Sequence, residues 1–254
     1  EYRRRRLEQH SDAVSVEGSG NLVAEFPASA GAEGGKRILL TAHMDEVGFM
    51  VSHVESNGFL RVAALGSIDT LLLSGTPVQF LDPDGNPIPG VFTSIPPHVR
   101  KKDESASAPA LEDLAVDLGT GSRERVEELG LTVGSVGTFL SPFRELGDGA
   151  VMGKAFDDRS GCNIALQTAL RWVGALDASP EETDKKRPKN SLVCLFTTGE
   201  EHNHHGARAA ALSQEADVVI ALENTTTTDT PGVPEHQVIT RLGDGPALTL
   251  ADRS

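Results

Sequence analysis

Short runs of hydrophobic residues recur along the chain and predict buried β-strands. Such runs occupy residues 37–42, 192–196 and 218–222. A continuous apolar run of about four to eight residues is typical of a strand that is buried on both faces. Between 159 and 175 the apolar residues instead recur at helical spacing, which predicts a long helix. Strands alternating with helices favour an α/β fold, with a mostly parallel sheet flanked by helices.

Weaker patterns predict further elements along the chain. Helices are expected over 1–10, 122–130 and 206–212, and further strands over 20–26 and 47–54. The second of these helices follows a serine, a residue type that suits an N-cap.

The middle of the chain has a different texture, with short β-like runs separated by turns. Asp82–Asn86 is a hairpin signal, and closely spaced strands of this kind are typical of a small β-barrel. We therefore expect a discontinuous α/β catalytic domain over 1–56 and 148–254, its C-terminus missing, interrupted by a barrel insert over 57–147. Two charged stretches are expected to be loops, over 101–110 and 177–190.

Charge and composition limit the partners. The 254 residues include 23 Lys and Arg against 37 Asp and Glu, a formal net charge of −14. A field of this sign repels phosphate groups, so we expect neither nucleic acid nor an anionic membrane as a partner. No apolar run approaches the length of about 18 residues that a transmembrane helix needs.

The cysteines and the chain ends bear on location. Only Cys162 and Cys194 are present, which excludes a disulfide scaffold and favours a reducing compartment. No apolar run follows the basic start at Arg3–Arg6, so no secretory signal is recognised and we expect a cytoplasmic protein. The chain begins with Glu1 rather than Met, and we expect both ends to be truncated.

Charged and polar side chains gather where the predicted strands end. His43 follows the first run, Glu200 and Glu201 follow the second, and Glu223 follows the third, while Asp157 precedes the long helix. Ligands bind at such strand ends in open α/β sheets. An imidazole with several carboxylates suits divalent metals, and a free carboxylate can take a proton from water.

Each of these residues also has an ordinary structural interpretation. His43 could cap a surface loop, the glutamate pair could be solvated, and Asp157 or Asp158 could cap the helix. Their occurrence at successive strand ends favours a metallohydrolase. Asp45 lies two residues from His43, on the same face of an extended segment, where it could orient the imidazole.

At these residues the chain resembles the family-42 metallopeptidases, the group of glutamyl aminopeptidase, tetrahedral aminopeptidase and the so-called endoglucanase M. Residues 41–51 resemble the family's first metal motif, 153–161 its bridging-aspartate motif and 197–201 its glutamate pair. The segments 229–232 and 243–246 are also similar to family signatures. The resemblance runs from about residue 20 to the end of the chain.

The resemblance implies roles for the candidate residues. His43 would bind one metal ion together with Glu223, Asp157 would bridge both ions, and Glu201 would bind the second. The ions would be Zn²⁺ or Co²⁺, with Mn²⁺ as a further possibility for oxygen-rich ligands. Glu200 would act as general base, and Asp45 would support His43.

The resemblance also implies an activity and an assembly. It implies an aminopeptidase that acts on peptide substrates, built from an α/β core with a β-barrel dimerisation insert. Homo-oligomers from dimers to dodecamers are expected. A glycosidase is disfavoured, because aromatic residues make up only 4% of the chain and leave few platforms for sugars.

Three departures from the family pattern keep alternatives open. Glu223 stands where the family has Asp, which also admits a carboxypeptidase- or deacylase-like hydrolase. The segment His202–Gly206 is rich in histidines, which we interpret as a loop rather than as spare ligands. The family's last histidine ligand lies beyond the end of this chain, and His236 is a poor substitute, so a catalytically inactive assembly subunit is a third hypothesis.

Overall fold

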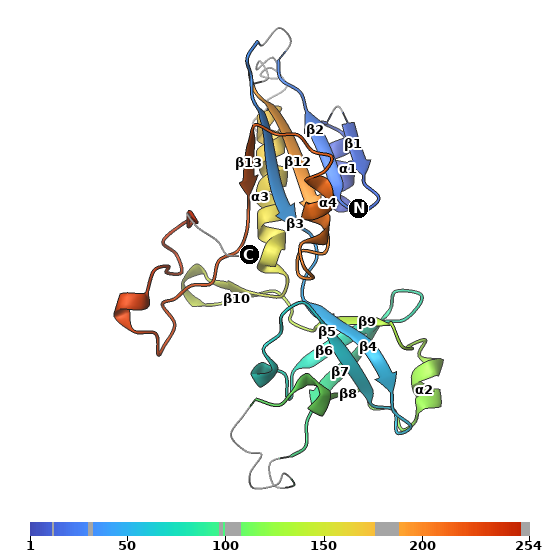
Figure 1. Cartoon of the computed structure of the whole chain (residues 1–254). Helices are drawn as coiled ribbons and strands as arrows, with labels where there is room; N and C mark the ends of the chain where they lie inside the picture. Colours follow the sequence, from blue (N-terminus) through green and yellow to red (C-terminus); the bar gives the residue numbers. More distant parts are fainter. Residues whose placement is uncertain (12, 30–32, 97–98, 100–107, 176–187, 250–254) are drawn as a thin grey trace.

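The computed structural model contains a five-stranded mixed sheet and a closed six-stranded barrel, joined near the ends of the sheet strands (Figure 1). No helix in the described part of the chain combines the length and apolarity that crossing a membrane requires. The structure describes residues 1–11, 13–29, 33–96, 99, 108–175 and 188–249.

The sheet has the strand order β1-β2-β12-β3-β13, with β1 (Ala13–Val16), β2 (Leu22–Phe26), β3 (Arg37–His43), β12 (Ser191–Thr197) and β13 (Val218–Ala221). β12 and β13 run parallel to β3, whereas β2 runs antiparallel to both β1 and β12. The expectation of a mostly parallel sheet is therefore met only in part, because β2 runs against the other four strands and makes the sheet mixed. The short turn between β1 and β2 leaves room only for an antiparallel hairpin, and the sequence pattern did not reveal β1.

Helices cover both faces of the sheet. α3 (Phe156–Trp172) and α1 (Tyr2–Glu8) pack on one face, and α4 (His205–Ala210) packs on the other (Figure 1). Alternate residues of the buried strands serve the two cores, so Leu40 faces α3 and Leu39 faces α4. The helices predicted over 1–10, 159–175 and 206–212 are confirmed, with shifted ends.

The barrel closes in the order β4-β5-β8-β7-β6-β9 around a separate hydrophobic core. Phe49 lies in that core, with its ring 4.8 Å from Phe92 and 5.0 Å from Phe139 between ring centroids. The strands are β4 (Gly48–Val54), β5 (Leu60–Leu65), β6 (Pro77–Leu81), β7 (Pro87–Thr93), β8 (Ala115–Asp117) and β9 (Val136–Phe139).

Strand pairing assigns β4 to the barrel, because β4 pairs with β5 and β9. The expected boundary at residue 56 had instead placed this strand in the α/β domain. The division into two domains stays a prediction. The predicted helix at 122–130 is confirmed as α2 (Arg123–Glu128), whose N-cap Ser122 accepts a hydrogen bond from the backbone N–H of Arg125.

The remaining elements include a two-stranded ribbon of β10 (Arg144–Glu145) and β11 (Val151–Met152) and short 3₁₀ helices at 70–72, 111–113, 147–149 and 235–237. The predicted loop regions lie largely outside the described residues. The strand expected at 218–222 exists as β13, but it is not buried. Val219 is 60% exposed, because β13 pairs only with β3 among the described strands.

Candidate metal centre

His43 is the centre of the candidate site. It is the last residue of β3 and is 2% exposed. Its Nε2 lies 2.8 Å from Oδ1 of Asp157, at the start of α3, and 3.5 Å from Oε1 of Glu223, just after β13. β13 runs parallel to β3 and ends beside it, so Glu223 arrives at the same edge of the sheet as His43.

The glutamate pair joins His43 from the other neighbouring strand. Glu200 and Glu201 follow β12, which also runs parallel to β3. Oε2 of Glu200 lies 3.7 Å from Nε2 of His43. The site is therefore assembled from the carboxyl ends of three adjacent parallel strands and the start of one helix, as the sequence predicted.

Asp45 connects the two sides of this arrangement. Its two carboxylate oxygens accept hydrogen bonds from the backbone N–H groups of Glu200 and Glu201, both at 3.2 Å. Oδ1 of Asp45 also lies 3.6 Å from Nδ1 of His43, and the Asp45 carbonyl oxygen lies 3.2 Å from the same nitrogen. Sequence spacing suggested the contact with His43, but it gave no sign of the bonds to the glutamate pair.

Within the described ranges, two groups of side chains have the composition and spacing to hold a metal ion. One contains His43, Asp157 and Glu223, and the other contains His43, Glu200 and Glu201, with the ligand atoms of each within 4.8 Å of one another. Imidazole nitrogen with carboxylate oxygen is a donor set that suits Zn²⁺ and Co²⁺. The residues present therefore fit a metal centre.

Crowding of carboxylates changes the protonation of the site. Burial disfavours the charged imidazole, but neighbouring carboxylates, Asp45 first, outweigh burial and raise the pKa of His43 to about 11. Burial, followed by repulsion from Asp157, raises the pKa of Glu201. Burial and Glu223 likewise raise the pKa of Asp157. A divalent cation would offset the repulsion among these carboxylates and favour their charged forms.

Asp158 is a buried carboxyl that sequence reasoning considered only as a helix cap. It is fully buried and accepts hydrogen bonds from the backbone N–H of His43 at 3.2 Å and of Gly161 at 2.9 Å. Burial, followed by repulsion from Glu223, raises its pKa to about 6. Asp158 thus fixes the end of β3 against the first turn of α3, and its adjacency to Asp157 was the only signal in the sequence.

The later histidines divide into two kinds. His202 and His205 are exposed and pack edge to face on each other, with ring centroids 5.6 Å apart. His204 instead approaches the site, with Nδ1 2.9 Å from Oε1 of Glu200. His236 is exposed and belongs to neither metal-binding group among the described residues.

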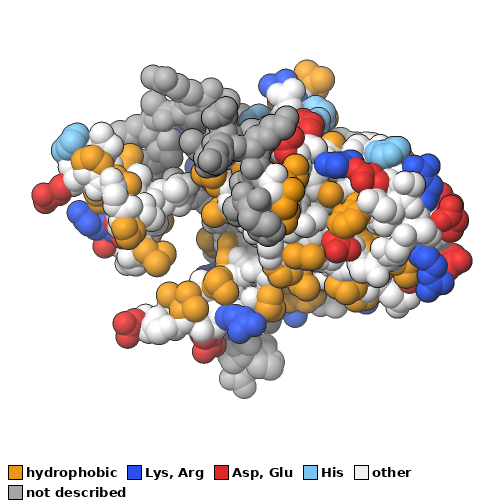
Figure 2. Space-filling model, turned by 90° about the horizontal axis from the view of Figure 1, so that it is seen from below, with side chains coloured by type: hydrophobic (Ala, Val, Ile, Leu, Met, Phe, Trp, Pro, Cys, Tyr) orange, Lys and Arg blue, Asp and Glu red, His pale blue; other side chains and the backbone are white. Residues whose placement is uncertain are grey.

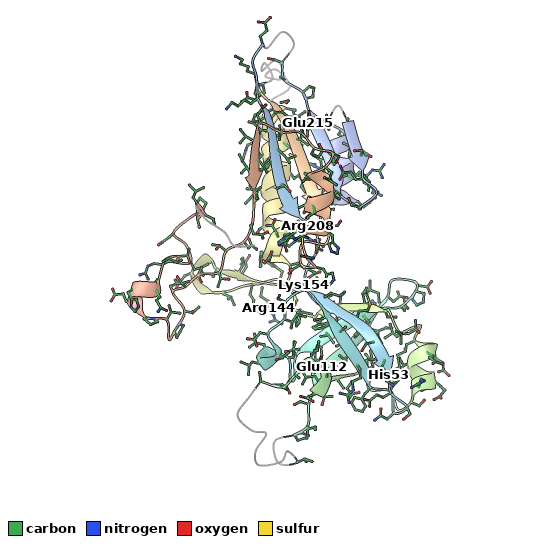
Figure 3. The ribbon with its side chains drawn as sticks, viewed as in Figure 1. His53, Glu112, Arg144, Lys154, Arg208 and Glu215 are labelled. Atoms are coloured by element: carbon green, nitrogen blue, oxygen red, sulfur yellow. The ribbon has the colours of Figure 1, made fainter. Side chains whose placement is uncertain are left out.

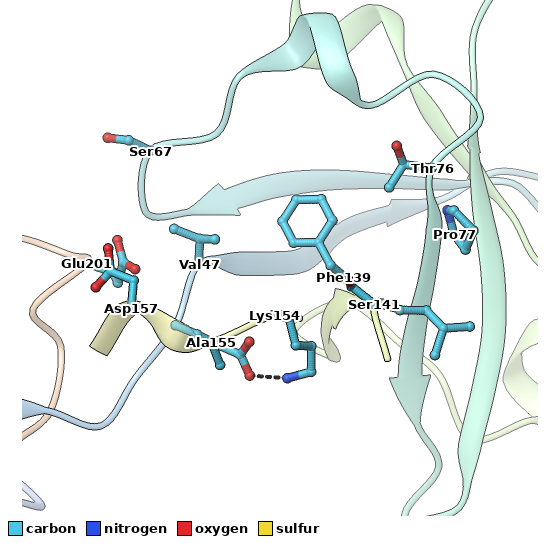
Figure 4. A pocket seen from close by; sticks show the side chains of 12 residues that line it. Val47, Ser67, Thr76, Pro77, Phe139, Ser141, Lys154, Ala155, Asp157 and Glu201 are labelled. Atoms are coloured by element: carbon cyan, nitrogen blue, oxygen red, sulfur yellow. Dashed lines mark hydrogen bonds and ion pairs between the residues drawn. The ribbon is translucent and has the colours of Figure 1, made fainter. Parts of the chain in front are cut away.

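A cavity of about 580 Å³ adjoins the carboxylates, between the sheet and the barrel (Figure 4). Asp157 and Glu201 lie at one end of it, and Val47 and Phe139 line its apolar part. Lys154, at the junction between sheet and barrel (Figure 3), is also in its wall and forms an ion pair with Glu46 at 2.5 Å.

Comparisons with known proteins identify the family of the chain. The model of the M42 glutamyl aminopeptidase family matches residues 20–254. The lysyl aminopeptidase of Pyrococcus furiosus is 29% identical over 246 residues, which cover 96% of this chain and 65% of that protein. The chain thus spans less than two thirds of the length of that relative.

Solved structures give the same result. The aminopeptidase APDkam598 from the archaeon Desulfurococcus kamchatkensis is similar with a TM-score of 0.85 and 32% identity, over 97% of this chain and 62% of that one. The TET1 peptidase of Pyrococcus horikoshii, which can assemble into a tetrahedron or a large octahedral shell, is similar with a TM-score of 0.70 and 28% identity, over 89% of this chain and 64% of that one.

Proposed function

Because the chain belongs to the M42 glutamyl aminopeptidase family, we propose that it acts as a binuclear metal-dependent aminopeptidase on peptides. One observation supports the proposal above all others. A buried histidine, His43, faces Asp157, Glu223 and the glutamate pair at the meeting point of three parallel strands. Such a constellation is the donor set of a co-catalytic metal site, next to a cavity of a size that suits a peptide side chain.

We propose that His43, Asp157 and Glu223 would hold one ion and that Glu201 would hold the other, with Asp157 serving both. The ions would be Zn²⁺ or Co²⁺, with Mn²⁺ also compatible. When bound, they would lower the pKa of water and polarise the peptide carbonyl group. Asp45 accepts hydrogen bonds from the backbone of Glu200 and Glu201 and so holds both glutamates in place beside the proposed ions.

Glu200 serves as the general base in this proposal. Its carboxylate takes one proton from the attacking water as the water oxygen forms a bond to the carbonyl carbon of the first peptide bond. It then returns that proton to the nitrogen as the carbon–nitrogen bond breaks, so the products are a free amino acid and a shortened peptide. Oε2 of Glu200 faces the ligand cluster, as this role requires.

The cavity beside the carboxylates supports a preference for uncharged side chains. Val47 and Phe139 offer apolar surface, and the charge of Lys154 is already paired with Glu46. A charged substrate side chain would have to displace that pair or remain unpaired, which is unfavourable away from water. Leucine and phenylalanine peptides should therefore be cleaved faster than lysine or glutamate peptides.

The proposal is tested by Glu200→Ala. Loss of the base should lower kcat by about 10²–10⁴-fold and leave metal binding intact. Glu215→Ala is the matched control, because Glu215 lies at the far end of the sheet from Lys154 and is exposed (Figure 3). Normal turnover by the Glu200 variant would contradict the mechanism.

A carboxypeptidase- or deacylase-like hydrolase is the second candidate, and Glu223 favours it. The longer glutamate at this position reaches within 3.5 Å of His43, so it is in place to act as a ligand. Substrates with a free or a blocked α-amine separate the two activities. Equal turnover of N-blocked peptides would exclude the aminopeptidase. Failure of every substrate would instead favour the third hypothesis, an inactive assembly subunit.

Assembly into homo-oligomers is part of the proposal. The similar TET1 peptidase forms closed shells, and we propose dimers to dodecamers for this chain through its barrel. Exposed hydrophobic side chains are visible in the view from the barrel end (Figure 2), and Leu71 and Leu72 in the barrel part are 67% and 72% exposed. A cytoplasmic location is also proposed, because Cys162 and Cys194 are both free and buried.

A further inference from the structure

One histidine of the loop after the glutamate pair touches the proposed base. Nδ1 of His204 lies 2.9 Å from Oε1 of Glu200. The other carboxylate oxygen, Oε2, lies 3.7 Å from Nε2 of His43. The carboxylate of Glu200 is therefore held between two imidazoles, one at the ligand cluster and one in the loop.

The backbone that brings His204 to Glu200 is unusual. Asn203 and His204 both have positive φ, at 73° and 55°, in the left-handed region. Such a conformation is strained for most residues other than glycine and is concentrated at functional sites. The backbone N–H of His204 donates to the carbonyl oxygen of Glu200 at 3.0 Å, which closes a turn that returns the ring to its carboxylate.

We propose that His204 is a positioning residue for Glu200, an inference that rests on the proposed function. The ring engages Oε1, which limits rotation of the carboxylate and keeps Oε2 directed at the ligand cluster to accept the proton of water. His204 is only 37% exposed and Glu200 26%, so the contact is partly shielded from solvent.

Two substitutions separate the effect of the His204 side chain from the effect of its backbone conformation. His204→Gly removes the ring but adopts the left-handed conformation freely, whereas His204→Asn tolerates that conformation and supplies an N–H donor at a similar place. We expect kcat of the Gly variant to fall about 10- to 100-fold, the effect of losing a close polar contact with a charged group, with KM unchanged. The Asn variant should recover most of the loss.

His202→Ala is the matched control, since His202 belongs to the same loop but packs on His205. It should leave kcat unchanged. A Gly variant with the wild-type kcat would overturn the proposal, and so would an Asn variant as slow as the Gly variant. A lower kcat accompanied by a lower unfolding temperature in both variants would also overturn it, because the role would then be structural.

A measurement without turnover completes the test. In protein labelled with ¹⁵N-histidine, the ring signals of His204 should shift in Glu200→Ala and stay in place in Glu215→Ala. An unchanged His204 signal in Glu200→Ala would overturn the inference. The proposed function fails separately, through an active Glu200→Ala variant, whereas an inactive Glu200→Ala variant with an unaffected His204→Gly variant refutes only the role of His204.

Discussion

At the scale of single residues, Asp45 determines how the two sides of the site meet. Its carboxylate accepts hydrogen bonds from the backbone of Glu200 and Glu201 and also lies 3.6 Å from the His43 ring. One side chain therefore sets the position of the proposed base, of one proposed ligand and of the imidazole. Residues of this kind, which orient ligands without binding the ion, contribute strongly to metal affinity.

Replacement of Asp45 should therefore weaken the site without removing a ligand. We expect Asp45→Ala to lower metal affinity by about 10- to 100-fold. Asp45→Asn keeps one oxygen acceptor and should lose less. Calorimetric titration with Zn²⁺ measures both, and an Asp45→Ala variant that binds as tightly as the wild type would show that the glutamate pair needs no such support.

Asp158 makes the stability of the metal-free chain depend on pH. Its pKa is about 6 in the folded chain against an ordinary value of 3.8. The folded state therefore binds more protons between these values, and the free energy of unfolding falls as pH rises through this window. Urea unfolding of metal-free wild type and Asp158→Asn at both ends of the window isolates this contribution. A wild type that gains stability relative to the variant with rising pH would contradict it.

The gathering of the candidate residues in space was largely predictable, because each of them follows an apolar run or precedes a helix. His43, Glu200 and Glu223 needed only the strand ends to be located. The bonds from Asp45 to the glutamate pair and the contact of His204 with Glu200 were not predictable. They depend on backbone conformation in loops, and side-chain type alone does not determine that conformation.

At the scale of elements, the start of α4 is fixed against the sheet by close backbone contact. Buried Asn21, before β2, donates to the carbonyl oxygen of Gly206 at 2.9 Å and accepts from the backbone N–H of Thr198 at 3.1 Å. A β-carbon at Gly206 would lie 2.3 Å from Oδ1 of Asn21 and 2.3 Å from the carbonyl oxygen of Thr198. Glycine is required here by space, and this contact determines the path of the loop that carries the glutamate pair.

Gly206→Ala should therefore destabilise the fold. Overpacking of this kind lowers the free energy of unfolding by about 1–3 kcal/mol. Gly121→Ala is the control, because its β-carbon would meet nothing within 4 Å. Chemical denaturation compares the free energies of unfolding of the two variants. Equal stability would mean that the loop after β12 accommodates the added methyl group without cost.

The strand pattern explains which elements the sequence could predict. β3 and β12 are continuous apolar runs buried on both faces, and both were located. β1 is short and, with one partly buried residue and three exposed ones, lacks the long buried run of β3 and β12. β2 runs antiparallel to both of its neighbours, β1 and β12, and this makes the sheet mixed. The pairing of β4 with barrel strands could not be predicted for another reason, since an apolar strand fits a sheet and a barrel equally well.

At the scale of the whole molecule, the site lies where the sheet meets the barrel. The carboxylates come from the sheet and its helix, and the cavity beside them is completed by barrel residues such as Phe139 (Figure 4). Gly66, which follows β5, also approaches the site, since a β-carbon there would lie 3.2 Å from Glu201. The candidate ligands thus come from the sheet and its helix, whereas residues of the sheet part and of the barrel together shape the cavity.

The central claim is a metal centre built on His43, and metal stoichiometry tests it most directly. The chain is loaded with Zn²⁺, dialysed to equilibrium and measured by elemental mass spectrometry, beside His43→Ala and the control His53→Ala. His53 is exposed in the barrel, away from the junction (Figure 3). We predict two ions per chain in the wild type and in the His53 variant, with loss of bound metal in the His43 variant. No bound ion in the wild type, or full retention in His43→Ala, would contradict the account.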